Sequence, residues 1–357
     1  MNLRFDSDMI TYTGRTQTTG TGSRWFFPST RADVRFKGTK VSFKCTNRNF
    51  WGIVCIGIVI DGRMCRVHLR DEYNMKETEY LAAENLEPDK VHTLTVFKML
   101  ASNHSFELNE LICDGEFLPS DHKYDLSLEY YGDSVSAGEM TEADFFTGRS
   151  DPSSSDSVYD NSWFSYTWQC ARLLNARFHN ISQGGISVLD GTGYFHYPDY
   201  IGMESVFDKT CYFPEGNELR DGEKPCLTDW DFSKYTPDIV IFALGQNDAH
   251  RADDTTVDIY DEKLRRNWKD AYKKLISDVN GRYGGKPEII LLTTVLMHDP
   301  GWDDAIDEVT KELCAEGVKA HHFLFSRNGK ATPGHPRRYE HSEMAGELAK
   351  YISSLHI

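Results

Sequence analysis

The chain shows two patterns of hydrophobic and polar positions, one after the other. From about Met9 to Glu116, short runs rich in Val, Ile, Phe and Tyr alternate with turn signals, and no helical period interrupts them. The runs typical of strands are Ile10–Thr13, Arg24–Phe27, Asp33–Phe36, Val41–Cys45, Gly52–Ile60, Cys65–Leu69, His92–Lys98 and Ser105–Ile112. Short strands at this spacing predict an all-β sandwich over residues 1–116, with a jelly roll as the favoured variant.

From Tyr124 onwards, strand-like and helix-like segments alternate, which predicts a parallel sheet covered by helices on both faces. The predicted strands are Leu126–Tyr131, Phe178–Ile181, Asp238–Leu244, Glu288–Leu296 and Ala320–Phe325. The predicted helices are Ser162–Leu174, Tyr260–Val279, Asp303–Glu316 and a last one with Met344, Leu348, Tyr351, Ile352 and Leu355. We therefore expect an α/β domain over residues 124–357, joined to the sandwich by a linker at 117–123.

Length and composition agree with two soluble domains. The chain has 357 residues, more than one core usually supports, and its mean hydropathy is −0.52. The formal net charge of −16 argues against nucleic acid or an anionic membrane as a partner, because both bind basic surfaces. A neutral sugar ligand is compatible with that charge, and the oligomeric state stays open.

The sequence gives no indication of a secretion signal, a membrane span or a metal site. Met1–Asp6 lacks the apolar segment of a secretion signal, so we expect a cytoplasmic protein, and no run approaches the ~18 apolar residues of a membrane span. Cys211 and Cys226 share one irregular loop and could form a disulfide, although a reducing compartment favours free thiols. Because neither a C-x-x-C nor an H-E-x-x-H pattern occurs, we expect no metal and no cofactor.

A candidate nucleophile follows the first strand of the α/β domain. Leu126–Tyr131 runs directly into Gly132-Asp133-Ser134, and a small residue before a serine lets the chain turn sharply and present the hydroxyl. The hydroxyl then lies at the carboxyl edge of the sheet, where open α/β sheets place their sites. Alone, such a triplet is more often an ordinary turn, since a catalytic serine also needs a base and oxyanion donors.

Three later blocks offer those partners at the same edge. Gly184 and Gly185 follow the second predicted strand, where glycines permit a close backbone approach and a free N–H. Asn247 follows the third strand, and its amide can donate to an oxyanion, although an Asx-turn would explain it alone. His335 stands between the last strand and the last helix, where Pro336 suits the first helical turn, so its imidazole can serve as the base.

These four blocks fill, in order, the four letters of the SGNH, or GDSL-type, hydrolases, which residues 124–357 resemble. The sandwich sharpens the resemblance, because the two-domain chain is similar to carbohydrate esterase family two. The motifs that carry this similarity are T-G-R at Thr13–Arg15, F-K-G-T at Phe36–Thr39, V-I-D-G at Val59–Gly62 and H-T-L-T-V-F-K at His92–Lys98.

The resemblance implies an enzyme that removes O-acetyl groups from plant polysaccharides such as xylan and mannan. It implies Ser134 as the nucleophile and His335 as the base. The implied oxyanion hole consists of Ser134, Gly184, Gly185 and Asn247.

One position departs from the SGNH pattern. Most of these hydrolases carry an aspartate three residues before the histidine, and here that position is Thr332. Some members of the esterase family hold the imidazole with a backbone carbonyl instead. We therefore expect a Ser134–His335 dyad, aided by a backbone carbonyl or by a distant acid. If a carbonyl holds the ring, no carboxylate lies at Nδ1, and the pKa of His335 is at or below its ordinary value of about 6.5.

The same expectation makes nearby carboxylates dispensable. Asp133, Asp299 and Glu340 lie close in sequence to the candidate blocks, but none is expected to orient the histidine. Asp133 is expected to stabilise the turn, because the side chains of adjacent residues diverge.

Substrate contacts are indicated only weakly. Trp302, Trp163, Tyr194 and Tyr339 could stack on a sugar ring, although core packing explains such aromatic residues about twice as often. Two polar insertions, Glu139–Asn161 and Tyr194–Tyr235, leave the sheet on the side of the candidate serine and are candidate walls of the site.

The sequence favours a carbohydrate O-acetyl esterase with an acetylated oligosaccharide or polysaccharide as substrate. A general short-chain esterase, thioesterase or lysophospholipase is a second interpretation, against which the polar insertions argue. A carbohydrate-binding protein with a vestigial catalytic domain is a third, and Thr332 is the residue that supports it.

Overall fold

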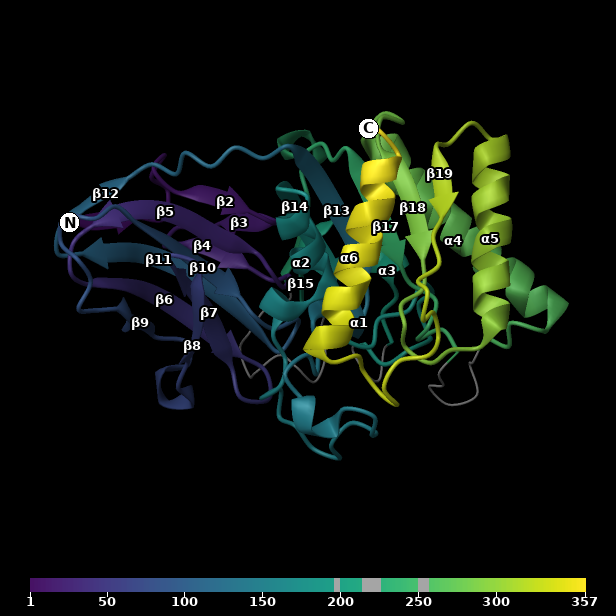
Figure 1. The fold of residues 1–357 in the computed structure, drawn as a ribbon, viewed down its shortest axis with the longest axis horizontal. Helices are drawn as coiled ribbons and strands as arrows, with labels where there is room; N and C mark the ends of the chain where they lie inside the picture. Colours follow the sequence, from purple (N-terminus) through teal and green to yellow (C-terminus); the bar gives the residue numbers. More distant parts are fainter. Residues whose placement is uncertain (196–199, 214–225, 250–256) are drawn as a thin grey trace. The chain divides into compact units, whose positions relative to one another are not determined.

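The computed structural model describes residues 1–195, 200–213, 226–249 and 257–357 (Figure 1). The chain forms two compact units. One unit consists of Met1–Lys123, Asp156–Val158 and Thr210–Asp229. The other consists of Tyr124–Ser155, Tyr159–Lys209 and Trp230–Ile357. Two short segments from beyond Lys123 therefore group with the N-terminal unit.

The first unit is a jelly-roll sandwich of two antiparallel sheets, as the strand pattern predicts. One sheet has the strand order β3-β4-β11-β6-β9 with β1 beside β11, and the other has the order β12-β5-β10-β7-β8 with β2 beside β5. The strands are β1 (Asn2–Arg4), β2 (Thr11–Thr13), β3 (Thr16–Thr18), β4 (Ser23–Trp25), β5 (Arg31–Lys37), β6 (Val41–Asn49), β7 (Cys55–Ile60), β8 (Arg63–His68), β9 (Glu77–Ala83), β10 (His92–Lys98), β11 (His104–Cys113) and β12 (Glu116–Leu118). A 3-10 turn, Asp71–Tyr73, precedes β9, and the pair β15 (Lys209–Phe213) and β16 (Cys226–Asp229) forms a separate two-stranded sheet.

Apolar side chains from both sheets fill the sandwich. Trp25 and Phe106 of one sheet are fully buried with their ring centroids 4.9 Å apart, and Phe36 and Ile56 of the other sheet belong to the same core. Inward-facing residues alternate with outward-facing ones along β5, and this period of two is the signal that predicted the strands.

β9 was not among the predicted strands, for a physical reason. Among the described strands it pairs only with β6, at the edge of its sheet, and its residues are exposed or half-buried. An edge strand needs few apolar side chains, and Glu77 and Glu79 give this segment a polar sequence.

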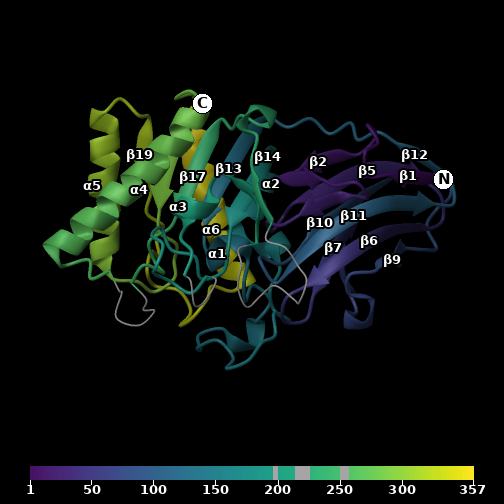
Figure 2. The same cartoon turned by 180° about the vertical axis from the view of Figure 1, so that it is seen from behind.

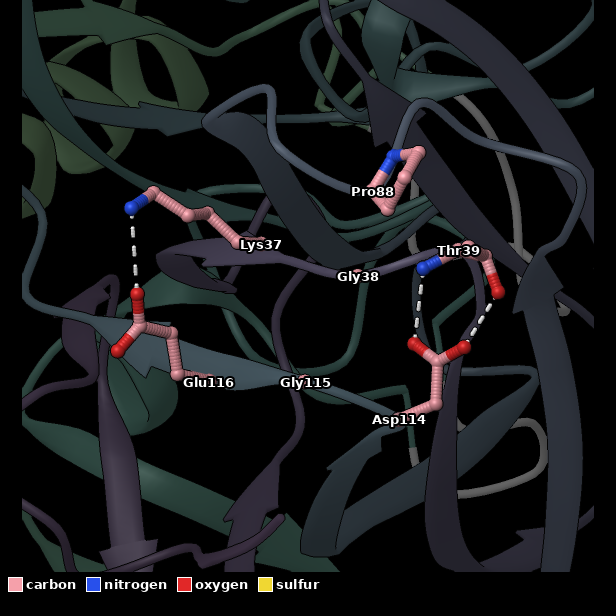
Figure 3. Close-up of a pocket in the computed structure, with 7 residues that line it drawn as sticks. All are labelled: Lys37, Gly38, Thr39, Pro88, Asp114, Gly115 and Glu116. Carbon is pink, nitrogen blue, oxygen red and sulfur yellow. Dashed lines mark hydrogen bonds and ion pairs between the residues drawn. The ribbon is translucent and has the colours of Figure 1, made fainter.

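A surface pocket lies between two turns of the sandwich, Lys37–Thr39 and Asp114–Glu116 (Figure 3). Its polar groups contact one another. The Asp114 carboxylate accepts a hydrogen bond from the backbone N–H of Thr39 at 2.8 Å, and Lys37 forms an ion pair with Glu116 at 3.3 Å. These contacts tie the two turns together.

The second unit is a parallel sheet with the strand order β14-β13-β17-β18-β19. Helices α2 and α6 pack together on one face, and α4 and α5 cover the other (Figure 1, Figure 2). The strands are β13 (Leu126–Gly132), β14 (Ala176–Ser182), β17 (Ile239–Ala243), β18 (Glu288–Leu292) and β19 (Ala320–His322). The helices are α1 (Ser134–Ala137), α2 (Tyr166–Leu173), α3 (Met203–Val206), α4 (Glu262–Arg282), α5 (Pro300–Ala315) and α6 (Arg338–Ser354), with 3-10 turns at Asp144–Phe146, Ser162–Phe164 and Phe232–Lys234.

The predicted helix starts differ from the structure, and the differences at the first and last helices have clear physical reasons. The helix predicted from Ser162 begins as a 3-10 turn, and α2 starts only after Ser165, whose hydroxyl accepts the N–H of Thr167 as its cap. The last helix starts at Arg338, so Pro336 precedes the helix instead of occupying its first turn. There the Glu340 side chain accepts the backbone N–H of Arg337, a contact that no proline could make.

Two further expectations fall partly outside the described residues. The insertion Tyr194–Tyr235 contains residues 196–199 and 214–225, which the structure does not describe. The side chain of Cys226 lies outside the described part of the chain, so a disulfide between Cys211 and Cys226 stays an open alternative. None of the described helices is long and apolar enough to cross a membrane.

Candidate active site

The ends of three neighbouring strands bring the candidate residues to one edge of the sheet. Gly132, the last residue of β13, lies between the last residues of β14 and β17 in the parallel register. Ser134 and Gly184 stand two residues beyond their strands, and Asn247 stands four residues beyond β17. The three loops therefore leave the sheet side by side.

Buried hydrogen bonds fix these loops to one another. Asp133 caps α1 by accepting the N–H of Val135 at 3.0 Å, and its other oxygen accepts the amide of Gln246 at 2.6 Å. Asp248 accepts the backbone N–H groups of Val188 and Leu189. The expectation that Asp133 stabilises the turn is thus confirmed.

Ser134 occupies the first position of α1, directly after a sharp turn. A side chain at Gly132 would place its Cβ 2.3 Å from the Ser136 hydroxyl, so only glycine fits between strand and helix. The helix ends after one turn at Gly138, which has a left-handed φ of 93°. The Ser134 hydroxyl lies 2.8 Å from Nε2 of His335, although the two residues are 201 positions apart in the sequence.

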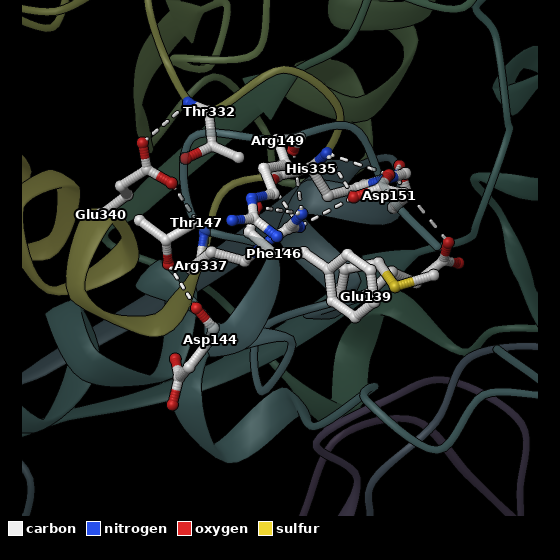
Figure 4. Close-up of polar contacts among 12 residues, drawn as sticks. Glu139, Asp144, Phe146, Thr147, Arg149, Asp151, Thr332, His335, Arg337 and Glu340 are labelled. Carbon is white, nitrogen blue, oxygen red and sulfur yellow. Dashed lines mark hydrogen bonds and ion pairs between the residues drawn. The ribbon is translucent and has the colours of Figure 1, made fainter. Parts of the chain in front are cut away.

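A distant acid lies at the histidine, so the alternative in which a backbone carbonyl holds the ring is wrong. Nδ1 of His335 lies 2.6 Å from Oδ2 of Asp151 (Figure 4). Asp151 comes from the insertion Glu139–Asn161, which leaves the sheet after α1 and returns along the loop before α6. The acid that contacts Nδ1 of His335 is therefore a residue 184 positions away in the sequence.

Residues around His335 hold Asp151 in place. The backbone N–H of His335 points to both carboxylate oxygens at 3.1–3.2 Å, and the fully buried Arg337 donates to Oδ1 at 2.8 Å. Gly334 has a φ of +90°, and a Cβ there would lie 2.7 Å from the Asp151 carboxylate. Thr332 accepts the backbone N–H of Gly148 at 3.1 Å, so the position where the usual acid would stand now anchors the loop that carries Asp151.

The carboxylates that are close in sequence do not reach the ring. Asp299 caps α5 by accepting the N–H of Gly301, and Glu340 accepts the N–H groups of Thr332 and Arg337. Asp151 carries no local sequence signal, since it lies in a polar segment with serines and a proline. The position of Asp151 depends on how the insertion Glu139–Asn161 folds back towards His335. No periodic pattern of hydrophobic residues predicts that course.

The charges around the imidazole raise its pKa, against the expectation of an ordinary or lowered value. Burial by itself would lower the pKa of His335, but the hydrogen bond to Asp151 and the negative charge of that carboxylate raise it. Burial likewise opposes ionisation of Asp151, but the contacts with His335 and Arg337 bring its pKa down to about 2. Asp151 is therefore ionised at neutral pH and favours the imidazolium form.

The predicted oxyanion donors lie on loops that leave the same edge of the sheet as the serine. Among the described residues, no acceptor is found for the backbone N–H groups of Ser134 and Gly184. Asn247 donates one amide hydrogen to the carbonyl of Ile186 at 2.9 Å, which fixes the orientation of its amide. Gly185 has a φ of +72°, and its carbonyl accepts the N–H of Tyr194 at 2.8 Å.

The four aromatic candidates for substrate binding differ in exposure. Trp302 is wrong as a sugar contact, because it lies in the first turn of α5, is 1% exposed and packs edge-on against Trp268 at 5.0 Å. Trp163 is half-buried, and the Arg172 guanidinium covers its ring at 4.1 Å. Tyr194 and Tyr339 are exposed, so their role stays a prediction.

Comparison with known proteins finds a family and a relative that match this chain in sequence. Residues 12–120 match the family described as carbohydrate esterase 2 N-terminal. A curated relative, the cellulase/esterase CelE of Acetivibrio thermocellus, is 28% identical over 169 residues. That match covers 47% of this chain and 17% of CelE, so the chain spans less than a fifth of the length of this relative.

Solved structures match this chain over almost its whole length. A family two carbohydrate esterase from Clostridium thermocellum, in complex with cellohexaose, aligns with a TM-score of 0.78 at 22% identity, over 97% of this chain and 98% of that one. An acetyl xylan esterase, Est2A, from the rumen bacterium Butyrivibrio proteoclasticus aligns with a TM-score of 0.79 at 20% identity, over 99% and 98%. By the sequence of its N-terminal unit and the fold of its full length, the chain thus resembles the esterases of carbohydrate esterase family two.

Proposed function

We propose that this protein is a carboxylic ester hydrolase that removes acetyl groups from sugars by nucleophilic catalysis. The observation that carries the proposal is the continuous chain of hydrogen bonds from the Ser134 hydroxyl through His335 to Asp151. Serine, imidazole and carboxylate in this order activate a hydroxyl that is otherwise a weak nucleophile. The names of the relatives support an esterase that acts on acetylated carbohydrate.

In the first half-reaction, Nε2 of His335 takes the proton of the Ser134 hydroxyl as the oxygen attacks the acetyl carbonyl. Asp151 keeps Nδ1 protonated and stabilises the imidazolium that forms. The backbone N–H groups of Ser134 and Gly184 and the amide of Asn247 are the candidate donors to the developing oxyanion. His335 then protonates the sugar oxygen, which leaves as an alcohol, and Ser134 remains acetylated.

In the second half-reaction, water replaces the sugar. Nε2 of His335 takes a proton from the water as it attacks the acetyl-serine, and the same oxyanion donors act again. Collapse of the intermediate returns the proton to Ser134 and releases acetate. The arrangement needs no group beyond the residues named.

The two other interpretations of the sequence lose support. A vestigial catalytic domain rested on Thr332, but Asp151 supplies the carboxylate from another segment. A lipase-like or thioesterase activity would require a long apolar acyl groove. The carboxyl groups of Glu139 and Asp151 near His335 argue for a polar substrate instead.

The proposal is tested by acetate release from acetylated xylan and acetylated mannan, with p-nitrophenyl esters of rising acyl length measured in parallel. We expect acetate release from at least one polysaccharide, and a steep fall in kcat/KM from the acetyl to the butyryl ester. Equal or rising rates for longer acyl chains would contradict a site built for acetyl groups.

Ser134→Ala is the matched variant for this assay. It should abolish acetate release and leave the thermal midpoint nearly unchanged, because removal of one hydroxyl at the sheet edge changes little packing. Substantial residual turnover by a folded Ser134→Ala protein would remove this serine from the mechanism.

A further inference from the structure

A chain of buried side chains crosses the edge of the sheet that carries the candidate nucleophile. Asp133 follows β13, Gln246 follows β17 and Thr294 follows β18, and these strands are neighbours in the sheet (Figure 1). The Gln246 amide donates to Oδ2 of Asp133 at 2.6 Å, and its carbonyl oxygen accepts the Thr294 hydroxyl, also at 2.6 Å. All three residues are at most 4% exposed, so bulk water does not compete for these contacts.

The partners of Gln246 allow only one orientation of its amide. Oε1 faces two donors, the hydroxyl of Thr294 and its backbone N–H, the latter at 3.3 Å. Nε2 faces the Asp133 carboxylate, whose other oxygen accepts the N–H of Val135. A rotated amide would set oxygen against carboxylate and N–H against N–H, so both contacts would become repulsive. Gln246 is therefore a bridge of fixed direction between two loops.

One end of this bridge controls the turn that presents the nucleophile. Asp133 stands directly before Ser134, and its carboxylate caps α1 through the N–H of Val135, at the second helical position. The N–H of Ser134 has no acceptor among the described residues and stays available for an oxyanion. An Asp133 carboxylate without its Gln246 donor is free to change the geometry of the cap, and the direction of the Ser134 N–H changes with it.

The other end of the bridge belongs to the loop of the second donor. Gln246 directly precedes Asn247, whose amide is oriented by the carbonyl of Ile186 at 2.9 Å. One side chain thus joins the loop with the backbone donor to the loop with the amide donor. The spacing of such donors matters, because a displacement of about 1 Å can cost about 10²-fold in rate.

We propose that Gln246 is a positioning residue that keeps the Ser134 N–H and the Asn247 amide at the spacing that an oxyanion requires. Thr294 orients Gln246 for this role. The inference rests on the proposed esterase function and adds to it a residue that acts through its neighbours, without contact with the substrate.

Gln246→Met tests the role of the amide, because methionine has a similar length and volume and donates no hydrogen bond. With p-nitrophenyl acetate and acetylated xylan as substrates, kcat should fall by about 10- to 100-fold, with less than about threefold change in KM, since the donors act mainly in the transition state. The thermal midpoint, measured in parallel, shows whether the variant is folded.

Thr294→Val tests the other end of the chain. It should lower kcat less than Gln246→Met does, because the backbone N–H of Thr294 still faces Oε1 of Gln246. The double variant should lie within about twofold of Gln246→Met, since both side chains act through one connection. Losses that simply multiply would show that the two residues act independently.

Gln246→Glu gives a readout in the pH profile. When protonated, the new carboxyl can still donate to Asp133 and accept from Thr294, but when ionised it sets two carboxylates against each other. Burial already raises the pKa of Asp133, against the hydrogen bond from Gln246, so in the variant the two carboxyls should share one proton until the pH becomes alkaline. Well below the thermal midpoint, kcat of the variant should then fall at high pH, a limb that the native protein lacks.

The native protein is the reference for this limb. The groups that titrate near Asp133 within the described ranges are His335, Glu139 and Tyr166, and all of them are present in the native protein as well. An additional alkaline limb therefore belongs to the new carboxyl. A merely structural role would change the thermal midpoint and leave the pH profile of kcat as it is.

Gln169→Met is the matched control. The Gln169 amide on α2 also makes two contacts, since it donates to the carbonyl of Phe164 and accepts the hydroxyl of Ser342. The control should lower the thermal midpoint and keep kcat within about twofold of the native value. A folded Gln246→Met protein with kcat within about threefold of native, a loss confined to KM, or an equal loss in the control would overturn the inference. If Gln246→Met does not fold, the absence of the alkaline limb in Gln246→Glu would do so.

The two proposals fail in different ways. If the native protein releases acetate and the variants of Gln246 do so equally well, the inference about Gln246 fails and the esterase function stands. If the native protein hydrolyses neither substrate, the esterase function fails, and the inference with it.

Discussion

At the scale of single residues, His335 has each ring nitrogen assigned to one partner. Nε2 contacts the Ser134 hydroxyl at 2.8 Å, and Nδ1 contacts Asp151 at 2.6 Å. Arg337 in turn contacts both the Asp151 carboxylate and the carbonyl of His335. A carboxylate held on two sides can neither rotate away from the ring nor lose its charge easily, so the tautomer of the imidazole is fixed.

Asp151→Asn tests this assignment. The amide can present its N–H to Nδ1 and stabilise the wrong tautomer, so kcat should fall by about 10³- to 10⁴-fold while the fold persists. The base works in its neutral form, and Asp151 raises the pKa of His335 in the native protein. The acidic limb of kcat/KM should therefore lie above pH ~6.5 in the native protein and move to lower pH in the variant.

Asp299→Asn serves as the control, because Asp299 caps α5 without contacting the ring. It should leave kcat and the pH profile unchanged. A native level of turnover in Asp151→Asn, or an acidic limb that does not move, would mean that the site works as a serine–histidine dyad without Asp151.

At the scale of elements, the strands and their ends could be predicted from the sequence, while the returning loop could not. β17 is buried along its whole length, and such a continuous apolar run predicts a central parallel strand. Once the strands are known, Ser134, Gly184 and Asn247 follow at one edge. Asp151 was missed because its place depends on how residues 139–161 fold back, which is set by single hydrogen bonds and not by a hydrophobic period.

Thr332→Val tests how firmly that loop is anchored. The change keeps the shape of the buried side chain but removes the acceptor for the N–H of Gly148. Gly148 is exposed, so water can replace the lost acceptor, and the loss of this partly buried hydrogen bond costs about 0.5–1.5 kcal/mol. The loop should therefore loosen, and Asp151 with it. We expect kcat to fall by about tenfold, less than in Asp151→Asn, together with a drop of a few degrees in the thermal midpoint.

Thr332→Ser keeps the hydroxyl and should restore most of the activity. If Thr332→Val lowers the thermal midpoint and leaves kcat unchanged, the loop is stabilised by this contact but Asp151 does not depend on it.

At the scale of the whole molecule, acidic residues dominate, and the charge of −16 accompanies several carboxyl groups with shifted pKa values. Burial raises the pKa of Asp248 to about 7, although it accepts backbone N–H groups of Val188 and Leu189, and raises that of Glu139 to about 8. In contrast, the pKa of Asp151 is lowered to about 2. The two kinds of group make opposite contributions to the dependence of stability on pH.

The thermal midpoint should therefore pass through a maximum in mildly acidic solution. Between about pH 5 and pH 8 the folded protein keeps protons on Asp248 and Glu139 that the unfolded chain has already lost, so the free energy of unfolding falls as pH rises. Below about pH 4 the carboxyl of Asp151 binds a proton in the unfolded chain but stays ionised in the folded protein. The free energy of unfolding therefore falls again as pH drops. Repulsion among the excess acidic residues adds to the loss at high pH.

Glu139→Gln separates the effect of this one carboxyl on the pH dependence of stability from the effect of the net acidic charge. Removal of a carboxyl that is disfavoured in its charged form should raise the thermal midpoint near pH 8 and leave it almost unchanged near pH 5. The curve of the variant should then be flatter than that of the native protein between about pH 6 and pH 8, while the acidic side of the two curves coincides. Differential scanning calorimetry over this range checks both statements. A native midpoint that rises steadily up to pH 8, or two curves of equal slope, would mean that Glu139 is ionised without cost in the folded protein, and that a donor holds it there.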